Sequence, residues 1–140
     1  MKSIPILFSN IAGETHRSHI TYRAGEAITR HRLVKLSPDG TAVSVAGIGD
    51  RPIGLSTDEA APGEMLDIAL LGSSDTLTAQ ASGSIQAGDI LVPATEGHVQ
   101  ALPATTGSYR QIGIALRPAV ADALVEIMPC VPCPYTVDGN

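Results

Sequence analysis

The sequence predicts a mainly β protein, a small β-sandwich or β-barrel-like domain with an internal pseudo-duplication, little helix and an extended N-terminal arm. Three observations lead to this fold class. The 14 Gly and 10 Pro residues are spread along the 140-residue chain as turn punctuation, not gathered into linkers. Short runs of alternating apolar and polar residues lie between them. One group of such runs occurs twice, which predicts two related β units within one domain.

The duplicated unit covers residues 24–71 and 87–129. Each copy begins with an Ala-Gly-acid turn, AGE in the first and AGD in the second, followed by an apolar run. Each continues with an Arg-x-Ile-Gly segment, RPIGL or RQIGI, and a second apolar strand. Two copies are too few for a solenoid, so we expect each copy to bury its apolar face on the other.

The elements of the first copy follow from local chemistry. Residues 33–47 contain two β-prone runs around the turn Pro38-Asp39-Gly40, in which Gly supplies a positive φ. Residues 41–47 alternate Val with small residues, as a half-buried strand does. Residues 63–72 place three apolar side chains on one face and predict a further strand. We assign structural turns to Gly25, Glu26, Gly40, Gly54, Gly88, Asp89 and Gly113.

The second copy is preceded by residues 76–85, which predict a strand of low hydrophobicity or an edge strand. Residues 123–129 alternate and predict the last strand of the β domain, which we place at residues 23–130. Residues 118–126 also fit a short helix with Pro118 at its first position. Residues 131–140 are interpreted as a C-terminal tail.

The N-terminal segment, residues 1–22, lies outside the duplicated unit. Its apolar residues, Ile4 to Phe8, include the only Phe of the chain. One interpretation is an extra edge strand of the domain. The other is an extended arm that becomes ordered on a partner, where it could add a strand to a sheet edge.

The charge of the chain is uneven. Residues 1–36 contain six Lys and Arg against two acids, residues 37–140 contain three against twelve, and the net charge is −5. The basic segment fits contact with an acidic surface or nucleic acid, and it fits a solvated leader equally well. Nucleic-acid binding is disfavoured because Tyr22 is the only aromatic residue amid these charges and the acidic body would repel phosphate.

The start of the chain does not read as a signal peptide. The start, MKSIPILFSN, lacks the apolar core and cleavage site of a signal peptide, which favours synthesis in the cytoplasm. No apolar run reaches the roughly 20 residues that a transmembrane helix needs, so we expect no membrane partner.

No group of residues predicts catalysis, a metal site or a cofactor. The acids are scattered, and no phosphate-binding Gly loop is present. Cys130 and Cys133 form the segment CVPC, which we interpret as structural or incidental thiols, with a metal site or a disulfide as alternatives. A redox motif needs a helix N-terminus, and a zinc site needs four ligands. The three prolines around this segment disfavour a helix.

Residues 23–128 resemble the head-decoration, or capsid cement, proteins of tailed bacteriophages, of the lambda type. The shared order is a Gly-acid turn, a strand, a DG hairpin and an Ile-Gly strand. A small-residue linker, an apolar strand, the turn GSIQAGD and a closing Ile-Gly strand follow.

The resemblance implies a structural virion protein without enzyme activity or cofactor, made in the host bacterial cytoplasm. Such proteins form β-rich knobs, often homotrimers, on the exterior of the expanded capsid and join neighbouring subunits of the major capsid protein. Carried to this chain, the resemblance assigns capsid binding to the arm. The candidate residues are Ile4, Pro5, Ile6, Leu7, Phe8, Arg17, Arg30 and Arg32.

Two other functions are left open. Residues 24–36 also resemble the opening of the SAF-type domain of sialic-acid synthases, which would make the protein a small carbohydrate-binding β module. That module would have only Tyr22, Tyr109 and Tyr135 to stack on a sugar. A small trimeric enzyme with an intersubunit site is the third hypothesis, and the sequence offers no catalytic side chains for it.

Overall fold

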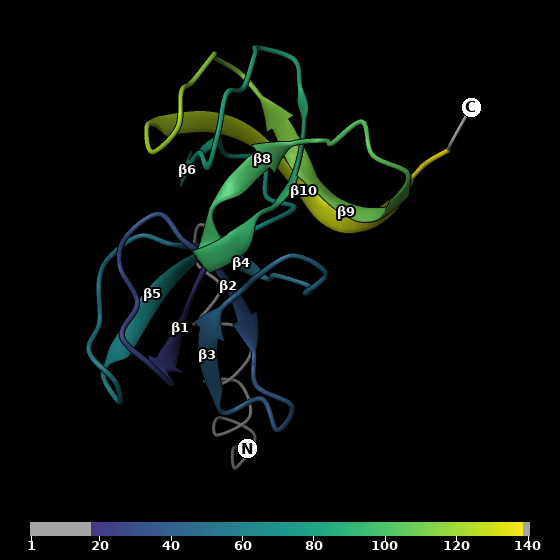
Figure 1. Ribbon diagram of the computed structural model, residues 1–140. Helices are drawn as coiled ribbons and strands as arrows, with labels where there is room; N and C mark the ends of the chain where they lie inside the picture. Colours follow the sequence, from purple (N-terminus) through teal and green to yellow (C-terminus); the bar gives the residue numbers. More distant parts are fainter. Residues whose placement is uncertain (1–17, 139–140) are drawn as a thin grey trace, which may run out of the picture.

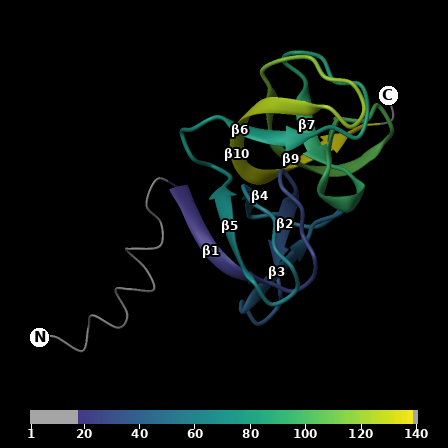
Figure 2. The same ribbon diagram turned by 90° about the vertical axis from the view of Figure 1, so that its left-hand side faces the viewer.

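The computed structural model describes residues 18–138, which form two β units stacked one on the other (Figures 1 and 2). The first unit, the first barrel, contains β1 (His19–Ala24), β2 (Leu33–Leu36), β3 (Ala42–Val45), β4 (Gly54–Ser56) and β5 (Met65–Leu70). The second unit contains β6 (Leu77–Gln80), β7 (Ile90–Pro93), β8 (Val99–Ala101), β9 (Gly107–Ala115) and β10 (Leu124–Val137). A short 3₁₀ turn, η2 (Thr95–Gly97), precedes β8. The mainly β fold with little helix is confirmed.

Both units have the same topology. The first is a closed barrel in the order β1-β3-β2-β4-β5, and the second is a five-stranded sheet in the order β6-β10-β9-β7-β8. Parallel pairing of β1 with β3 closes the first barrel. The matching contact in the second unit is a single parallel bridge between Ala81 and Val99. The internal duplication is therefore present as two copies of one five-stranded arrangement.

The boundaries of the two copies differ from those predicted, because the copies begin one strand earlier. Ala24 and Ala81 are equivalent, since the carbonyl of Ala24 accepts a 2.7 Å hydrogen bond from the Gly63 amide and that of Ala81 a 2.8 Å bond from the Asp122 amide. The segments that follow match in the same way, with antiparallel bridges Ile28–Ala60 and Ile85–Ala119.

This register pairs Gly25 with Ser82 and gives Gly88 a different counterpart, His31. The amide of His31 donates to the Ser56 carbonyl at 2.8 Å, and that of Gly88 donates to the Ala115 carbonyl at 2.7 Å. His31 and Gly88 both have left-handed backbones, with φ of 68° and 89°. The two Ala-Gly pairs that suggested the predicted register therefore belong to different turns.

Gly54 and Gly113 are equivalent, as the Ile-Gly match predicted, but they lie inside β4 and β9 instead of in turns. A Cβ on Gly54 would overlap the Ala69 carbonyl oxygen and lie 2.6 Å from Ile68 Cγ2. A Cβ on Gly113 would lie 2.6 Å from the Met128 carbonyl oxygen. The repeated Gly is needed because the neighbouring strand passes too close for any side chain.

The remaining turn residues lie at bends of the chain. Gly40, between β2 and β3, has a φ of 74°, which favours Gly. Glu26 accepts a 2.8 Å hydrogen bond from the Val45 amide, and Asp89 accepts one of the same length from the Gln86 amide. Asp89 therefore holds a turn, whereas Glu26 joins the bend after β1 to the end of β3.

The ends of the domain also differ from the prediction. No helix forms at 118–126, because Ala119 is held in its bridge with Ile85 and β10 begins at Leu124. Strand β10 continues through the expected tail as far as Val137, paired with β9. At the other end, residues 19–22 belong to β1 of the first barrel and not to a separate arm.

A shared core joins the two units. Leu33, Leu55 and Leu71 from the first barrel pack in one cluster with side chains of the second unit, among them Ile112 and Ile127. A separate cluster fills the interior of the first barrel. Because the larger cluster draws on both copies, the two units bury apolar surface on each other, as the duplication suggested.

Candidate interaction surfaces

The arm residues proposed for capsid binding lie mainly outside the described part of the chain. Ile4, Pro5, Ile6, Leu7, Phe8 and Arg17 belong to this group, and only Arg30 and Arg32 can be located. Residues 18–138 form two grooves that differ in charge and in the apolar side chains exposed beside them. These two grooves and the exposed Arg30 are the candidate contact regions.

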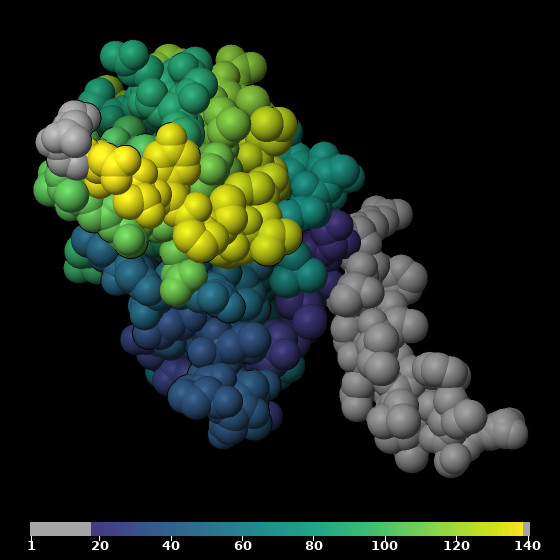
Figure 3. Space-filling view, turned by 90° about the vertical axis from the view of Figure 1, so that its right-hand side faces the viewer, coloured from purple at the N-terminus to yellow at the C-terminus, as the bar shows by residue number. Residues whose placement is uncertain are grey.

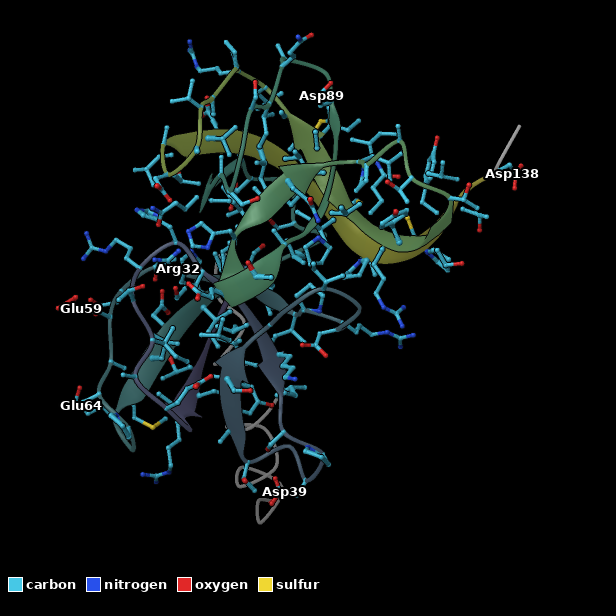
Figure 4. The ribbon with its side chains drawn as sticks, in the orientation of Figure 1. Arg32, Asp39, Glu59, Glu64, Asp89 and Asp138 are labelled. Atoms are coloured by element: carbon cyan, nitrogen blue, oxygen red, sulfur yellow. The ribbon has the colours of Figure 1, made fainter. Side chains whose placement is uncertain are left out.

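Arg30 and Arg32 both have partners within the chain. Arg30 is exposed and lies 3.6 Å from Asp58. Arg32, at the level between the two units (Figure 4), donates to Thr29 Oγ1 at 2.9 Å and to His98 Nε2 at 2.7 Å. His98 belongs to the second unit, so Arg32 links the two units. Arg30 is therefore exposed for contact with a partner, whereas the Arg32 side chain is bound within the junction of the two units.

Two shallow grooves occupy equivalent places on the two units, and their chemistry differs. The acidic groove on the first barrel has a volume of about 400 Å³ and is lined by Ala27, Ile28, Thr29, Glu59, Ala60, Ala61 and Glu64. The apolar groove on the second unit has a volume of about 490 Å³ and is lined by Ser84, Ile85, Gln86, Pro118, Ala119, Val120, Ala123 and Leu124. Figure 4 shows Glu59 and Glu64 on the same side of the first barrel.

The difference arises from single replacements between the copies. Pro118 stands where the first barrel has Glu59, and Ala123 stands where it has Glu64. Beside them, Val120 is 68% exposed and Leu124 is 54% exposed. Exposed apolar side chains gathered at an apolar groove are more typical of an interaction surface than scattered ones.

The apolar groove was not predicted from the sequence. Five of its eight lining residues lie in the segment 118–126 that also fitted a short helix, where Val120 and Leu124 would share one helical face. The groove becomes recognisable in the sequence only when the two copies are aligned in their structural register. The acids of the first copy are then seen to be replaced by apolar residues in the second.

The distal half of β10 forms a two-stranded ribbon with β9. Residues 133–137 pair with 107–111, including Tyr135 opposite Tyr109. Figure 3 shows the C-terminal residues (yellow) spread over one face of the molecule, above the blue surface of the first barrel. Pro132 and Pro134 lie on this strand, and a proline lacks the N–H that a further strand would need. This edge of the sheet is therefore blunted against strand addition.

Within residues 18–138, no group of three or more His, Cys, Asp or Glu side chains is arranged to hold a metal ion. In the same part of the chain, no helix has the length and apolar character of a membrane span.

His31 is a titratable group at the junction of the two units. It lines a cavity of about 240 Å³ together with residues of both units, including Leu55 and Thr78. Burial lowers the pKa of His31 below its ordinary value, and the charges of Arg30 and Arg32 lower it further against an opposing hydrogen bond with the backbone of Thr78. The folded protein therefore disfavours the protonated imidazole.

We expect the stability of the protein to fall in mild acid because of His31. Above the unfolded-state pKa the imidazole is neutral in both states and the full stability is present. As the pH falls through the unfolded and then the folded pKa of His31, the unfolded state binds the proton first and stability is lost. Urea unfolding from pH 8 to pH 5 measures this loss.

The variants His31→Gly and His31→Asn should reduce that pH dependence, since both residues accept the left-handed backbone of this position. The difference between the variant curves and the parent curve gives the contribution of His31. Parallel curves for the variants and the parent would show that another group causes the loss.

Comparison with known proteins agrees with this arrangement. The family model described as phage cement protein matches residues 13–128, which include both units up to the first part of β10. No curated protein matches the sequence.

A solved structure of a phage protein has the same fold. The head fiber gp8.5 N base of bacteriophage phi29 superposes on this chain with a TM-score of 0.64 at 19% sequence identity, covering 81% of this chain and 94% of the phi29 chain. The family match spans most of the sequence and confirms the resemblance drawn from the repeated turns and strands. The chain belongs to the phage cement protein family and is a capsid-binding structural protein of the virion.

Proposed function

We propose that the protein binds the outer surface of the expanded phage capsid and holds neighbouring subunits of the major capsid protein together without catalysing a reaction. The observation that carries the proposal is the family match over both units. A cement must contact at least two capsid subunits. The segment that leads into β1 and the apolar groove of the second unit would give a single chain two separate contact regions.

Binding alone is sufficient for this function. A protein that binds the expanded lattice and not the unexpanded one stabilises the expanded state by mass action. Several contacts on one rigid knob also raise the effective concentration of each remaining contact, so no single contact must be strong. Association of the knob into a homotrimer would multiply the contacts further, and the scarcity of large aromatic anchors favours such an arrangement.

We assign the capsid contacts to two parts of the chain. The first is the N-terminal segment with Ile4 to Phe8, which ends where β1 begins at His19. The second is the apolar groove around Val120 and Leu124, which would receive an apolar segment of the major capsid protein. Arg30 supplies an exposed charge near the first barrel, with Asp58 as its present partner.

Deletion of residues 2–17 tests the first contact. We expect the truncated protein to unfold at the same urea concentration as the full chain, because β1 and both cores are intact, and to lose capsid binding at least tenfold. Co-sedimentation with expanded capsids that lack this protein measures binding. Full-strength binding by the truncated chain would remove the arm from the proposal.

The variant Val120→Asp tests the groove, and Ala61→Asp, at the equivalent position of the acidic groove, is its matched control. Both add one exposed charge, so both should fold. The proposal expects weakened sedimentation for Val120→Asp alone. Equal binding by the two variants would show that the apolar groove does not contact the capsid. If neither deletion nor substitution reduces binding, the assigned surfaces are wrong, and no binding by the parent chain would contradict the proposed function itself.

A further inference from the structure

The segment Cys130-Val131-Pro132-Cys133 lies at an irregularity of β10. Pro129 pairs with Gly113, and the next pair along the ladder is Cys133 with Gln111. Four residue steps along β10 therefore face two steps along β9. The two extra residues are accommodated in a bulge that contains the first cysteine and ends at the second.

This register sets the spacing of the two cysteines. Two steps along β9 span about 7 Å, so the Cα atoms of Pro129 and Cys133 are held about that far apart, where an extended strand would separate them by about 13 Å. A disulfide requires a Cα–Cα distance of roughly 4.4–6.8 Å. The bulge therefore shortens the separation of Cys130 and Cys133 below that of an unbroken strand, toward the range that a disulfide spans.

Both cysteines also have the same residue of β9, Gln111, as a partner. Cys130 Sγ donates to the Gln111 carbonyl at 3.7 Å, and Gln111 is the residue opposite Cys133 in the ladder. Burial raises the pKa of the Cys130 thiol, and the charge of Cys133 and a side-chain hydrogen bond with it raise the pKa further. Cys130 is half-buried and Cys133 is exposed, so Cys133 is the thiol open to reagents.

We propose that Cys130 and Cys133 form an intramolecular disulfide by exchange with a low-molecular-weight disulfide once the virion leaves the reducing cytoplasm. The Cys133 thiol loses its proton to solvent and its sulfur attacks the small disulfide, which releases one small thiolate. The Cys130 thiol then loses its proton, its sulfur attacks Cys133 Sγ, and the second small thiolate leaves. Both thiolates take up the released protons, so the protein is oxidised by two electrons and the small disulfide is reduced.

Closing this bridge would fix the contact between the bulge and the linker that joins the two units. A Cβ on Gly72, just after β5, would lie 2.5 Å from Val131 Cγ2, so the Val131 side chain rests directly on the linker backbone. Val131 lies between the two cysteines. A disulfide across it therefore restrains the bulge against the linker, which suits a particle that persists outside the cell.

The test uses the purified full chain with oxidised glutathione. We expect the intact mass to fall by two hydrogens, both thiols to become unreactive, and a disulfide between Cys130 and Cys133 in the digested protein. Thermal unfolding of the oxidised form should be raised by about 3–8 °C over the reduced form, because the bridge restricts the unfolded chain.

Single variants separate closure from simple reactivity. Cys130→Ser should keep a stable glutathione adduct on Cys133, because the second thiol is missing, and Cys133→Ser should react slowly. Glutathione adducts on both cysteines of the parent protein, disulfide-linked dimers, or thiols that resist oxidation would each overturn the proposal.

The inference rests on the proposed position of the protein on the capsid exterior, and the test keeps the two apart. Oxidation is measured on the free protein and capsid binding by sedimentation. Failure to form the disulfide in a protein that still binds capsids would reject this inference alone. A disulfide in a protein that does not bind capsids would reject only the proposed function.

Discussion

Replacing Gly54 with Ala is expected to lower the free energy of unfolding by about 3–5 kcal/mol. The added Cβ would overlap the carbonyl oxygen of Ala69 and lie 2.6 Å from Ile68 Cγ2. The carbonyl belongs to the backbone of β5, which cannot rotate away as a side chain would. Relief would require β4 and β5 to separate, and these strands help to close the first barrel.

Urea denaturation measures this effect, and two further variants make it specific. Gly113→Ala should show a loss of similar size, because its Cβ would lie 2.6 Å from the Met128 carbonyl oxygen at the equivalent position of the second unit. Gly83→Ala is the control, since a Cβ there meets nothing within 4 Å. A near-neutral Gly54→Ala, or a loss equal to that of Gly83→Ala, would contradict the close strand crossing.

Replacing Leu33 with Ala is expected to cost about 2–5 kcal/mol, the range for a truncated buried leucine. Leu33 has 0% of its surface exposed and packs in the cluster that joins the two units. The cavity would open between elements of both copies. We therefore expect the loss to lower the stability of the whole molecule, in one cooperative transition, and not of the first barrel alone.

Leu36→Ala is the matched control, because it makes the same change on the same strand at a side chain that is 39% exposed. It should cost less than about 1 kcal/mol. Urea unfolding is followed by circular dichroism and by the emission of Tyr22 and the tyrosines of the second unit. These signals detect whether the two units unfold in separate transitions. Two transitions in the Leu33→Ala variant would show that the units unfold independently and that the cluster does not couple them.

The sequence was sufficient to predict the fold class and the existence of the duplication. The turn at Gly40 and the strand around Val43 are formed by residues that are neighbours in the chain, so their patterns can be recognised in the sequence. The Ile-Gly match was also correctly aligned, because Gly54 and Gly113 meet the same steric demand in both copies.

The register of the other half of the duplication was wrong for a physical reason. Gly readily takes a left-handed backbone at a turn, but other residues also take it when the fold compensates for the strain. His31 does so at the position equivalent to Gly88. Aligning the visible Gly of AGE with that of AGD therefore matched two different turns. Asp122, with a φ of 68° where the first barrel has Gly63, shows the same freedom.

Sequence alone determined that this chain forms short strands joined by tight turns, that it contains two related copies, and that its pattern is that of a phage cement protein. Only the tertiary structure decided that β10 runs on to Val137, that Arg32 links the units through His98, and that the apolar groove lies where the other copy is acidic. Strand period and turn chemistry depend on neighbours in the chain. Pairing register, ion partners and grooves depend on residues brought together by closure of the sheets, and these contacts leave no local pattern in the sequence.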